Sequence, residues 1–239
     1  MGKLLVKEKE VVVPGEELAD GMDYLPGIGT YREGDKIYAS KVGLTYLDGR
    51  AIKLVPLAGK YNPKKGDTII VKVKDIAFSG WNTDTNSAYT AMLNVKDATS
   101  DFIQRGADLS QIYKIGDYLV AKIVTVTSQK LIDLSMKGPG LKKLSGGRII
   151  KITPSKVPRL IGKKGSMVGM IKQATGCRLT VGQNGLVWLQ GEDPSKELIA
   201  VNTIGLIEQK AHISGLTDLV KKHLEEATGQ KLSVEGDQA

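Results

Sequence analysis

The chain has 239 residues, of which 41% are hydrophobic, and its 34 Lys and Arg against 26 Asp and Glu give a net charge of +8. This length allows one to three compact domains, and the basic balance is compatible with a polyanionic partner. The only cysteine is Cys177, which excludes an intrachain disulfide and a cysteine-based zinc site.

Residues 1–62 are predicted to form a β-rich domain. They contain the stretches VVVPGE and REGDKIYASKVGLTYLDGRAIKLV, with several Gly, Pro and Asp-Gly turn signals and no helical repeat. Asp48-Gly49 predicts a hairpin turn, because glycine accepts the positive φ that tight hairpins need. We expect the domain to end near residues 62–67, where Pro and Gly separate two strand-like runs.

Residues 63–137 contain five short runs that predict strands, namely DTIIVKVKDIA, GWNTDT, AYTAMLNV, YLVAKIVTVT and LIDLSM. In the first run Val71 and Val73 alternate with Lys72 and Lys74, which predicts a half-buried strand with its lysines in solvent. Five short strands favour a closed, S1-like barrel of the OB type, an architecture that binds single-stranded nucleic acid on one face. Residues 138–146, GPGLKKLSG, predict a linker without periodicity.

Residues 147–211 predict a different unit, with elements in the order βααββα. Met167, Met170, Ile171 and Ala174 recur at helical spacing and predict a buried stripe, with Gly176 at the helix end. QNG predicts a hairpin turn, and Asp193-Pro194 predicts the start of a long helix. Residues 212–239 are expected to form one further helix and a tail. The whole chain is therefore predicted to be a mixed α+β, multidomain protein.

The corner Gly162-Lys163-Lys164-Gly165 lies between the two predicted helices of this unit and resembles the G-x-x-G loop of a type I KH domain. This resemblance implies that the glycines let phosphates approach the backbone, while the lysines and the first amides of the next helix attract them. A solvated turn is the alternative. Arg159 and Arg178 flank the expected groove and are predicted to bind phosphates or to form local ion pairs.

The predicted barrel offers its own candidate RNA contacts. Trp81 and Phe78 are candidates for stacking on bases, although Trp81 is equally compatible with core packing or a subunit contact. The cationic candidates for following an RNA backbone are Lys72, Lys74, Arg105 and Lys122. The alternative for each of these four side chains is a charge that lies in solvent and contacts no RNA.

The order VVVPGE, YREGDKIYASKVGL, OB-type barrel and KH unit resembles the KH-containing cap subunits of the archaeal exosome, the Rrp4 family. The resemblance implies a trimeric cap, of this chain or with a related cap subunit, seated on a six-membered ring of phosphorolytic ribonuclease subunits. It also implies that the first domain docks on the ring and that the barrels line the pore. We therefore expect a non-catalytic subunit that captures single-stranded RNA and guides its 3′ end to 3′-5′ degradation or processing. The related cap subunit without a KH domain usually carries a zinc ribbon, which one cysteine cannot build.

Catalytic, metal and cofactor motifs are weak in this sequence. His212 and His223 are eleven residues apart, on roughly the same face of an expected helix, without an acidic partner at ligand spacing. Cys177 falls on an inward strand position, and GKKGS lacks the ending of a P-loop. We expect no catalytic residue, no metal and no cofactor. Since no apolar run approaches the roughly 20 residues of a membrane span and the first residues are charged, we also expect a cytoplasmic protein without a membrane segment.

Two other functions fit parts of the pattern. A free-standing OB/KH regulator of transcription or translation would use the same RNA-binding modules without a nuclease ring. Polynucleotide phosphorylase also joins these modules, but its KH unit precedes its barrel and both follow two catalytic domains, for which this chain has no room.

Overall fold

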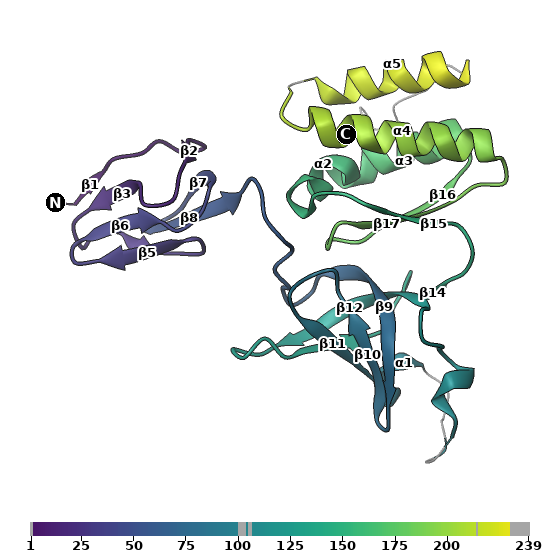
Figure 1. Ribbon diagram of the computed structural model, residues 1–239. Helices are drawn as coiled ribbons and strands as arrows, with labels where there is room; N and C mark the ends of the chain where they lie inside the picture. The colour runs from purple at the N-terminus through teal and green to yellow at the C-terminus, as the bar shows by residue number, and fades with distance from the viewer. Residues whose placement is uncertain (1, 100–103, 105–106, 214, 230–239) are drawn as a thin grey trace. The chain divides into compact units, whose positions relative to one another are not determined.

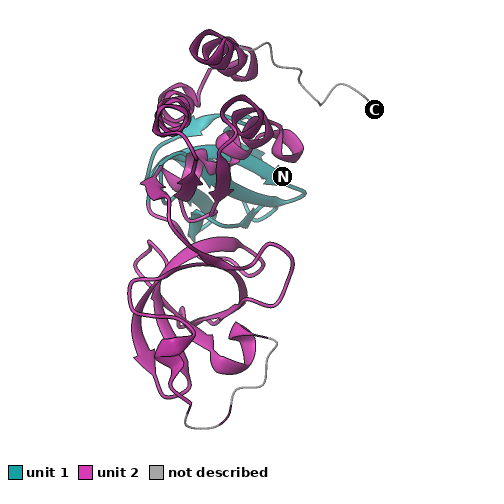
Figure 2. Cartoon of the chain, turned by 90° about the vertical axis from the view of Figure 1, so that its right-hand side faces the viewer, with its two compact units in different colours: residues 1–59 teal, residues 60–239 magenta. Residues whose placement is uncertain are grey.

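The computed structural model describes residues 2–99, 104, 107–213 and 215–229 (Figure 1). The chain forms two compact units, Met1–Gly59 and Lys60–Ala239, which are coloured separately in Figure 2. The boundary after Gly59 lies close to the predicted one at residue 62. The predicted linker at residues 138–146, in contrast, does not divide the second unit.

The first unit consists of two four-stranded sheets, in the orders β1-β3-β6-β5 and β2-β7-β8-β4. Both sheets contribute to one core that includes Val12, Leu18, Ile37 and Leu54. Gly49, with a φ of 59°, begins the tight connection between the last two strands, so the predicted hairpin is confirmed. The strands are β1 (Lys3–Leu4), β2 (Val11–Val12), β3 (Glu17–Asp20), β4 (Leu25–Pro26), β5 (Thr30–Glu33), β6 (Lys36–Ala39), β7 (Gly43–Asp48) and β8 (Ala51–Pro56).

The second unit begins with a closed five-stranded barrel, which confirms the predicted strands. Around the barrel each strand pairs with the next in the order β9, β10, β11, β13 and β12, and β12 pairs back with β9. The alternation in β9 follows the sequence pattern, because Val71 and Val73 are buried while Lys72 and Lys74 are exposed. The elements are β9 (Thr68–Ala77), β10 (Gly80–Asp84), β11 (Thr90–Asn94), α1 (Val95–Ala98), the 3-10 turn η1 (Leu109–Gln111), β12 (Tyr118–Val126) and β13 (Ile132–Ser135).

A KH fold follows, with the predicted βααββα order. Its sheet, in the order β15-β17-β16, packs one face against the helices through a core that includes Ile171, Leu189 and Ile204. Helix α2 has five residues, with Pro158 near its start, and Asp193 caps α4 as predicted. The elements are β15 (Arg148–Lys151), η2 (Pro154–Lys156), α2 (Val157–Ile161), η3 (Lys163–Gly165), α3 (Ser166–Thr175), β16 (Arg178–Val181), β17 (Leu186–Gln190) and α4 (Pro194–Lys210).

Helix α5 (Leu216–Thr228) belongs to the KH core. Its buried side chains Leu216, Val220 and Leu224 recur at helical spacing and join the core of the sheet and the other helices. The predicted additional helix therefore exists and completes the packing of the KH unit.

The barrel and the KH sheet share a small apolar cluster, which we call the seam. It consists of Ile70 and Val120 from the barrel, Leu186 and Trp188 from β17, and Leu144. Leu144 lies in β14 (Lys143–Leu144), which pairs with the start of β12. The expectation of an aperiodic linker at residues 138–146 is thus corrected: the segment adds a strand to the barrel because burying Leu144 against both domains removes apolar surface from water.

Candidate nucleic-acid interface

The Gly162-Lys163-Lys164-Gly165 corner joins α2 to α3, as predicted. Gly162 has a φ of 75°, and a Cβ at this position would lie 2.8 Å from Cβ of Met167, so only glycine fits there. Gly165 has a φ of 84° but open space around it. Both lysines are exposed, and Lys164 itself adopts a left-handed φ of 54°. The corner therefore presents backbone and two cations to solvent.

Two arginines accompany this corner. Arg159 lies in the last turn of α2 and Arg178 begins β16, an edge strand of the KH sheet, and both side chains are exposed. Within the described part of the chain neither arginine forms an ion pair, whereas Arg148 pairs with Glu197 at 3.2 Å. The alternative of local ion pairs is therefore not realised for Arg159 and Arg178, and their charges remain available to an external anion.

The barrel lysines point outward, as the alternation predicted. Lys72 lies over the ring of Tyr118, with its Nζ 5.8 Å from the ring centroid, and Lys74 forms an ion pair with Asp84 at 3.2 Å. Lys122 is exposed on β12. The fourth cationic candidate, Arg105, lies outside the described residues.

The stacking role predicted for Trp81 is wrong, because its side chain is 0% exposed. The indole packs edge-on against Tyr113 with ring centroids 5.1 Å apart, and its Nε1 donates a hydrogen bond to the Tyr113 carbonyl oxygen at 3.0 Å. Trp81 thus fills the barrel core. Phe78, in the turn between β9 and β10, is instead 96% exposed, so a base can reach its ring.

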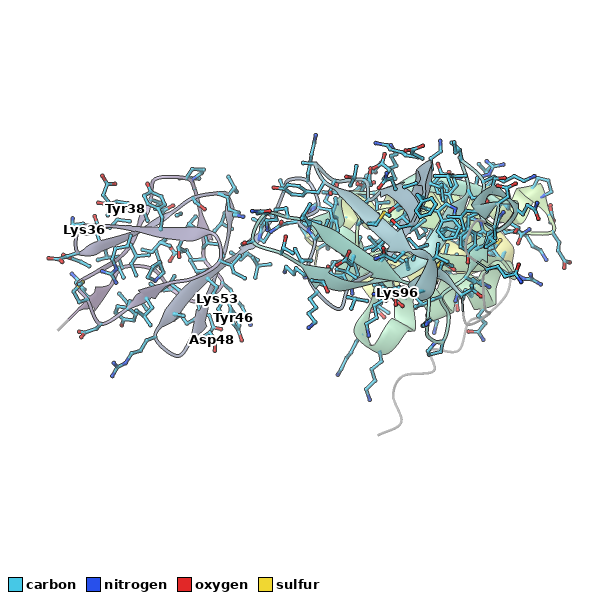
Figure 3. The ribbon with its side chains drawn as sticks, turned by 90° about the horizontal axis from the view of Figure 1, so that it is seen from below. Lys36, Tyr38, Tyr46, Asp48, Lys53 and Lys96 are labelled. Carbon is cyan, nitrogen blue, oxygen red and sulfur yellow. The ribbon has the colours of Figure 1, made fainter. Side chains whose placement is uncertain are left out.

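A cavity of about 620 Å³ lies beside Phe78. Its wall combines the β9–β10 turn with Asn94 at the end of β11, Lys96 in α1, and Asp108. Lys96 is labelled in Figure 3. Asn94 and Lys96 were not predicted from the sequence, because only the closed barrel brings the end of β11 and the start of α1 beside the β9–β10 turn.

The histidines and the cysteine have no catalytic arrangement in the described residues. His212 lies in the turn after α4 and His223 lies in α5, so the expectation that they share one helix face was wrong. Cys177 is 3% exposed and packs in the KH core. Over the same residues there is no cluster of three potential metal ligands, and no helix has both the length and the apolarity to cross a bilayer.

Comparisons with known proteins find relatives of both the first unit and the KH domain. A family profile described as "KH domain" matches residues 147–195, and one described as "Exosome complex exonuclease RRP4 N-terminal region" matches residues 11–46. A crystal structure of a protein assigned as an exosome complex RNA-binding protein superimposes with a TM-score of 0.63 and 35% identity, covering 71% of this chain and 97% of that chain.

Three curated relatives are all called Exosome complex component Rrp4. The one from Methanobrevibacter smithii is 45% identical over 98% of this chain and 77% of its own length. That from Methanothermus fervidus is 46% identical over 92% of this chain and 97% of its own length. That from Thermococcus kodakarensis is 44% identical, with 94% of this chain and 88% of the relative covered.

Proposed function

This chain belongs to the Rrp4 family of exosome components, and from that premise we propose that it is a non-catalytic, RNA-binding cap subunit. It captures single-stranded RNA and guides the 3′ end into a ring of phosphorolytic ribonuclease subunits. The observation that carries this proposal is the exposed Gly162-Lys163-Lys164-Gly165 corner within a KH fold, in a chain whose residues 11–46 match the Rrp4 N-terminal region.

Phosphate contacts supply most of the RNA affinity in this proposal. The glycines at 162 and 165 let a phosphate chain pass close to the backbone, and the exposed Lys163 and Lys164 neutralise its charge. Because such contacts carry no base information, sequence preference is modest and affinity falls steeply with salt. Phe78, beside the cavity of the barrel, adds a stacking platform.

The first unit docks on the ring in this proposal, and its apolar sheet face supports that role. On the sheet containing β7 and β8, Val11, Val55 and Tyr46 are 57%, 52% and 46% exposed. Val11 and Val55 both face Leu44 across the strands, and Tyr46 faces Lys53. Figure 3 labels Tyr46 and Lys53 together on this face. Exposed apolar side chains gathered in this way favour a protein partner, and we assign the ring subunits as that partner.

The cap contains three copies per ring in this proposal, of this chain alone or mixed with a related cap subunit. The barrels then surround the path of the RNA, and Lys72, Lys74, Lys122 and Arg105 provide its cationic lining. Catalysis resides in the ring, and the complex works in the cytoplasm.

The RNA-binding part of the proposal is tested by reversing the charge of the KH corner. In a filter-binding titration of single-stranded RNA, Lys163→Asp combined with Lys164→Asp should weaken binding at least tenfold without lowering the thermal midpoint, because both side chains are exposed. Lys9 is a matched control for Lys164, since it is another exposed lysine with a left-handed φ, 65°. Lys9→Asp should leave RNA affinity unchanged. Equal affinities for the corner variant and the wild type would remove the KH corner from the mechanism.

The docking part is tested by mixing the chain with the ring subunits and measuring the mass of the assembly and its phosphate-dependent RNA degradation. We expect three copies per six-membered ring and faster degradation. Val55→Asp should abolish assembly while leaving RNA binding by the isolated chain intact, because Val55 is exposed on the first unit. A chain without residues 1–59 that still joined the ring would refute this docking assignment.

A further inference from the structure

Charged side chains from two domains converge at the edge of the seam. Lys72 and Lys74 project from β9 of the barrel, Lys151 ends β15 of the KH sheet, and Asp84 ends β10. Asp84 faces Lys72 in the strand register and its Oδ2 lies 3.2 Å from Nζ of Lys74. The charge of Lys151 acts on the same carboxylate from the KH side. One acid is therefore shared by lysines that come from both domains.

An aromatic ring lies in the same place. Tyr118 faces Lys72 across β9 and β12, and the Lys72 ammonium lies over its ring. The half-buried Tyr118 also packs against the seam cluster that contains Leu186 and Trp188. This ring is fixed on one side and accompanied by a cation, an arrangement typical of surfaces that hold single-stranded nucleic acid.

Hydrogen bonds fix the two domains at this point. The Asn86 side chain donates to the backbone oxygen of Asn184 at 3.0 Å, and the Asn86 backbone N–H donates to Asp84 Oδ1 at 2.9 Å. Asn184, which is fully buried, belongs to the β16–β17 hairpin of the KH unit. The residue that holds Asp84 in place thus also holds the KH hairpin, so the lysines of the two domains keep a constant spacing.

The charge at the seam is unbalanced. Partial burial of Asp84 acts to raise its pKa, but the Asn86 N–H, Lys74 and Lys151 together hold that pKa below its ordinary value, so the group is ionised at neutral pH. Within the described residues Lys72 and Lys151 have no carboxylate within 4 Å. A network that served only to hold two domains together would pair its cations, whereas this one leaves a surplus of positive charge.

We propose that Lys72, Lys74, Lys151 and Tyr118 form a seam strip that binds the phosphate backbone of one RNA strand across the barrel and the KH sheet, with Asp84 as an internal competitor. The proposal rests on the RNA-binding function proposed above and extends the cationic lining assigned there to Lys72 and Lys74 onto the KH sheet, as a contact distinct from the Gly162–Gly165 corner. Single-stranded RNA fits because its phosphates recur along a flexible chain and its bases stack on an aromatic ring. Without RNA, Asp84 forms an ion pair with Lys74, and a phosphate of the bound RNA displaces the Asp84 carboxylate.

The test compares opposite changes of charge in the full chain, using single-stranded RNA at several salt concentrations. Asp84→Asn keeps an oxygen that accepts the Asn86 N–H but frees Lys74 and Lys151, so RNA affinity should rise about threefold and the salt dependence should steepen by about 0.7 in log–log slope, the value for one phosphate contact on a single strand. Lys151→Gln should lower the affinity and reduce the slope by about the same amount. Lys72→Gln should act like Lys151→Gln.

The matched controls come from an exposed pair on α5, in which Lys222 and Glu226 lie 3.9 Å apart. Glu226→Gln and Lys222→Gln make the same changes of charge and should leave RNA affinity and slope unchanged. If Asp84→Asn lowers the thermal midpoint while affinity stays constant, the cluster is a structural ion-pair network and the seam strip is refuted. Competition by oligoglutamate as effective as that by RNA of equal charge would also overturn it, in favour of an acidic protein partner.

The two proposals fail in different ways. If the wild-type chain binds no RNA, the proposed function itself falls. If the wild type binds RNA and the Lys163, Lys164 double variant weakens it, but none of the three seam variants changes affinity or slope, the seam strip falls together with the place of Lys72 in the cationic lining, and the KH corner keeps its role.

Discussion

The side chain of Asn184 bonds both backbone groups of Ile70, although the two residues are 114 positions apart. Asn184 Nδ2 donates to the Ile70 carbonyl oxygen at 2.7 Å, and the Ile70 N–H donates to Asn184 Oδ1 at 3.3 Å. Strand β10 ends at Asp84, opposite Lys72. Two residues earlier in β9, at Ile70, the side-chain amide of Asn184 takes the place of a β10 residue. Nδ2 also donates to the Thr85 carbonyl oxygen at 2.7 Å. The side-chain amide of Asn184, a residue of the KH domain, thus continues the hydrogen-bond ladder along β9 of the barrel.

Asn184→Ala should therefore destabilise the second unit. The substitution leaves one buried N–H and two carbonyl groups without their partner, and each unpaired buried group costs about 1–3 kcal/mol, partly relieved by water. We expect a loss of about 2–4 kcal/mol in the free energy of unfolding. Urea titration followed by tryptophan fluorescence measures it, because Trp188 lies in the seam and Trp81 in the barrel core. Hydrogen exchange at the Ile70 amide should accelerate in the native state.

The neighbouring Gln183 provides the control for this prediction. Its side chain is exposed, and its contact with the barrel is made by its backbone N–H, which donates to the Thr68 carbonyl oxygen at 3.0 Å. Gln183→Ala should change stability by less than about 0.5 kcal/mol. An Asn184→Ala protein with the wild-type urea midpoint and an equally protected Ile70 amide would show that the bonds contribute nothing net.

The QNG motif, residues 183–185, predicted the hairpin turn but not the contact of Asn184 with the barrel. QNG is a turn signal because Gly185 adopts positive φ, here 82°, and that property is local. Whether the asparagine faces solvent or another domain depends on which strand edge lies opposite, and no periodicity carries that information. The same limit explains Trp81: alternation along β10 gives two faces, and only the closed barrel decides which face is core.

Substitutions of Trp81 and Phe78 should have opposite consequences: the first should lower stability and the second should lower RNA affinity. Trp81→Phe removes the hydrogen bond to the Tyr113 carbonyl oxygen and leaves a small void, so we expect a loss of about 1–3 kcal/mol of stability with RNA affinity unchanged at a temperature where the variant is folded. Phe78→Ser should leave stability within about 0.5 kcal/mol, because the ring is 96% exposed. Its RNA affinity should fall about fivefold or more, since stacking of one base contributes about 1–3 kcal/mol.

Thermal melts and filter-binding titrations on the same two preparations check this pair of predictions. Reduced RNA affinity in a fully folded Trp81→Phe protein would show that the core ring shapes the binding face. Unchanged affinity in Phe78→Ser would remove the exposed ring and its cavity from the RNA path.

Two helical glycines, Gly169 in α3 and Gly205 in α4, give a matched pair. A Cβ added at either position meets nothing within 4 Å, so each substitution by alanine should stabilise the chain by about 0.5–1 kcal/mol through helix propensity. Gly169 lies four residues after Gly165 and therefore on the same face as the corner. Gly169→Ala should weaken RNA binding several-fold because its methyl group narrows the approach to α3, whereas Gly205→Ala should not.

Gly162→Ala should change stability in the opposite direction to Gly169→Ala and Gly205→Ala. Its positive φ and the nearby Met167 predict a loss of more than about 1 kcal/mol of stability. Differential scanning calorimetry ranks the three variants. If Gly169→Ala and Gly205→Ala bind RNA equally well, the strand does not cross the first turns of α3.

Asp117 should make the second unit sensitive to acid. Its carboxylate accepts a hydrogen bond from the Lys114 N–H at 2.7 Å and forms an ion pair with Lys143, which lies in the seam-forming strand β14. Partial burial acts to raise the pKa of Asp117, but the bonds to Lys143 and Lys114 outweigh it and hold that pKa below its ordinary value. A carboxylate with a lowered folded-state pKa stabilises the fold above its unfolded-state pKa of about 3.9.

This contribution is complete at neutral pH and is lost as pH falls below about 4 towards the folded-state value. The urea midpoint of the wild type should therefore exceed that of Asp117→Asn at pH 6, and the difference should shrink between about pH 4 and pH 2.5. Asp133→Asn, a change at an aspartate outside the ion pairs of the described residues, serves as the control and should not reproduce this convergence. The urea midpoints of wild type and Asp117→Asn could instead differ by the same amount down to pH 2.5. In that case the hydrogen bonds of residue 117 would stabilise β14, and the negative charge of Asp117 would not.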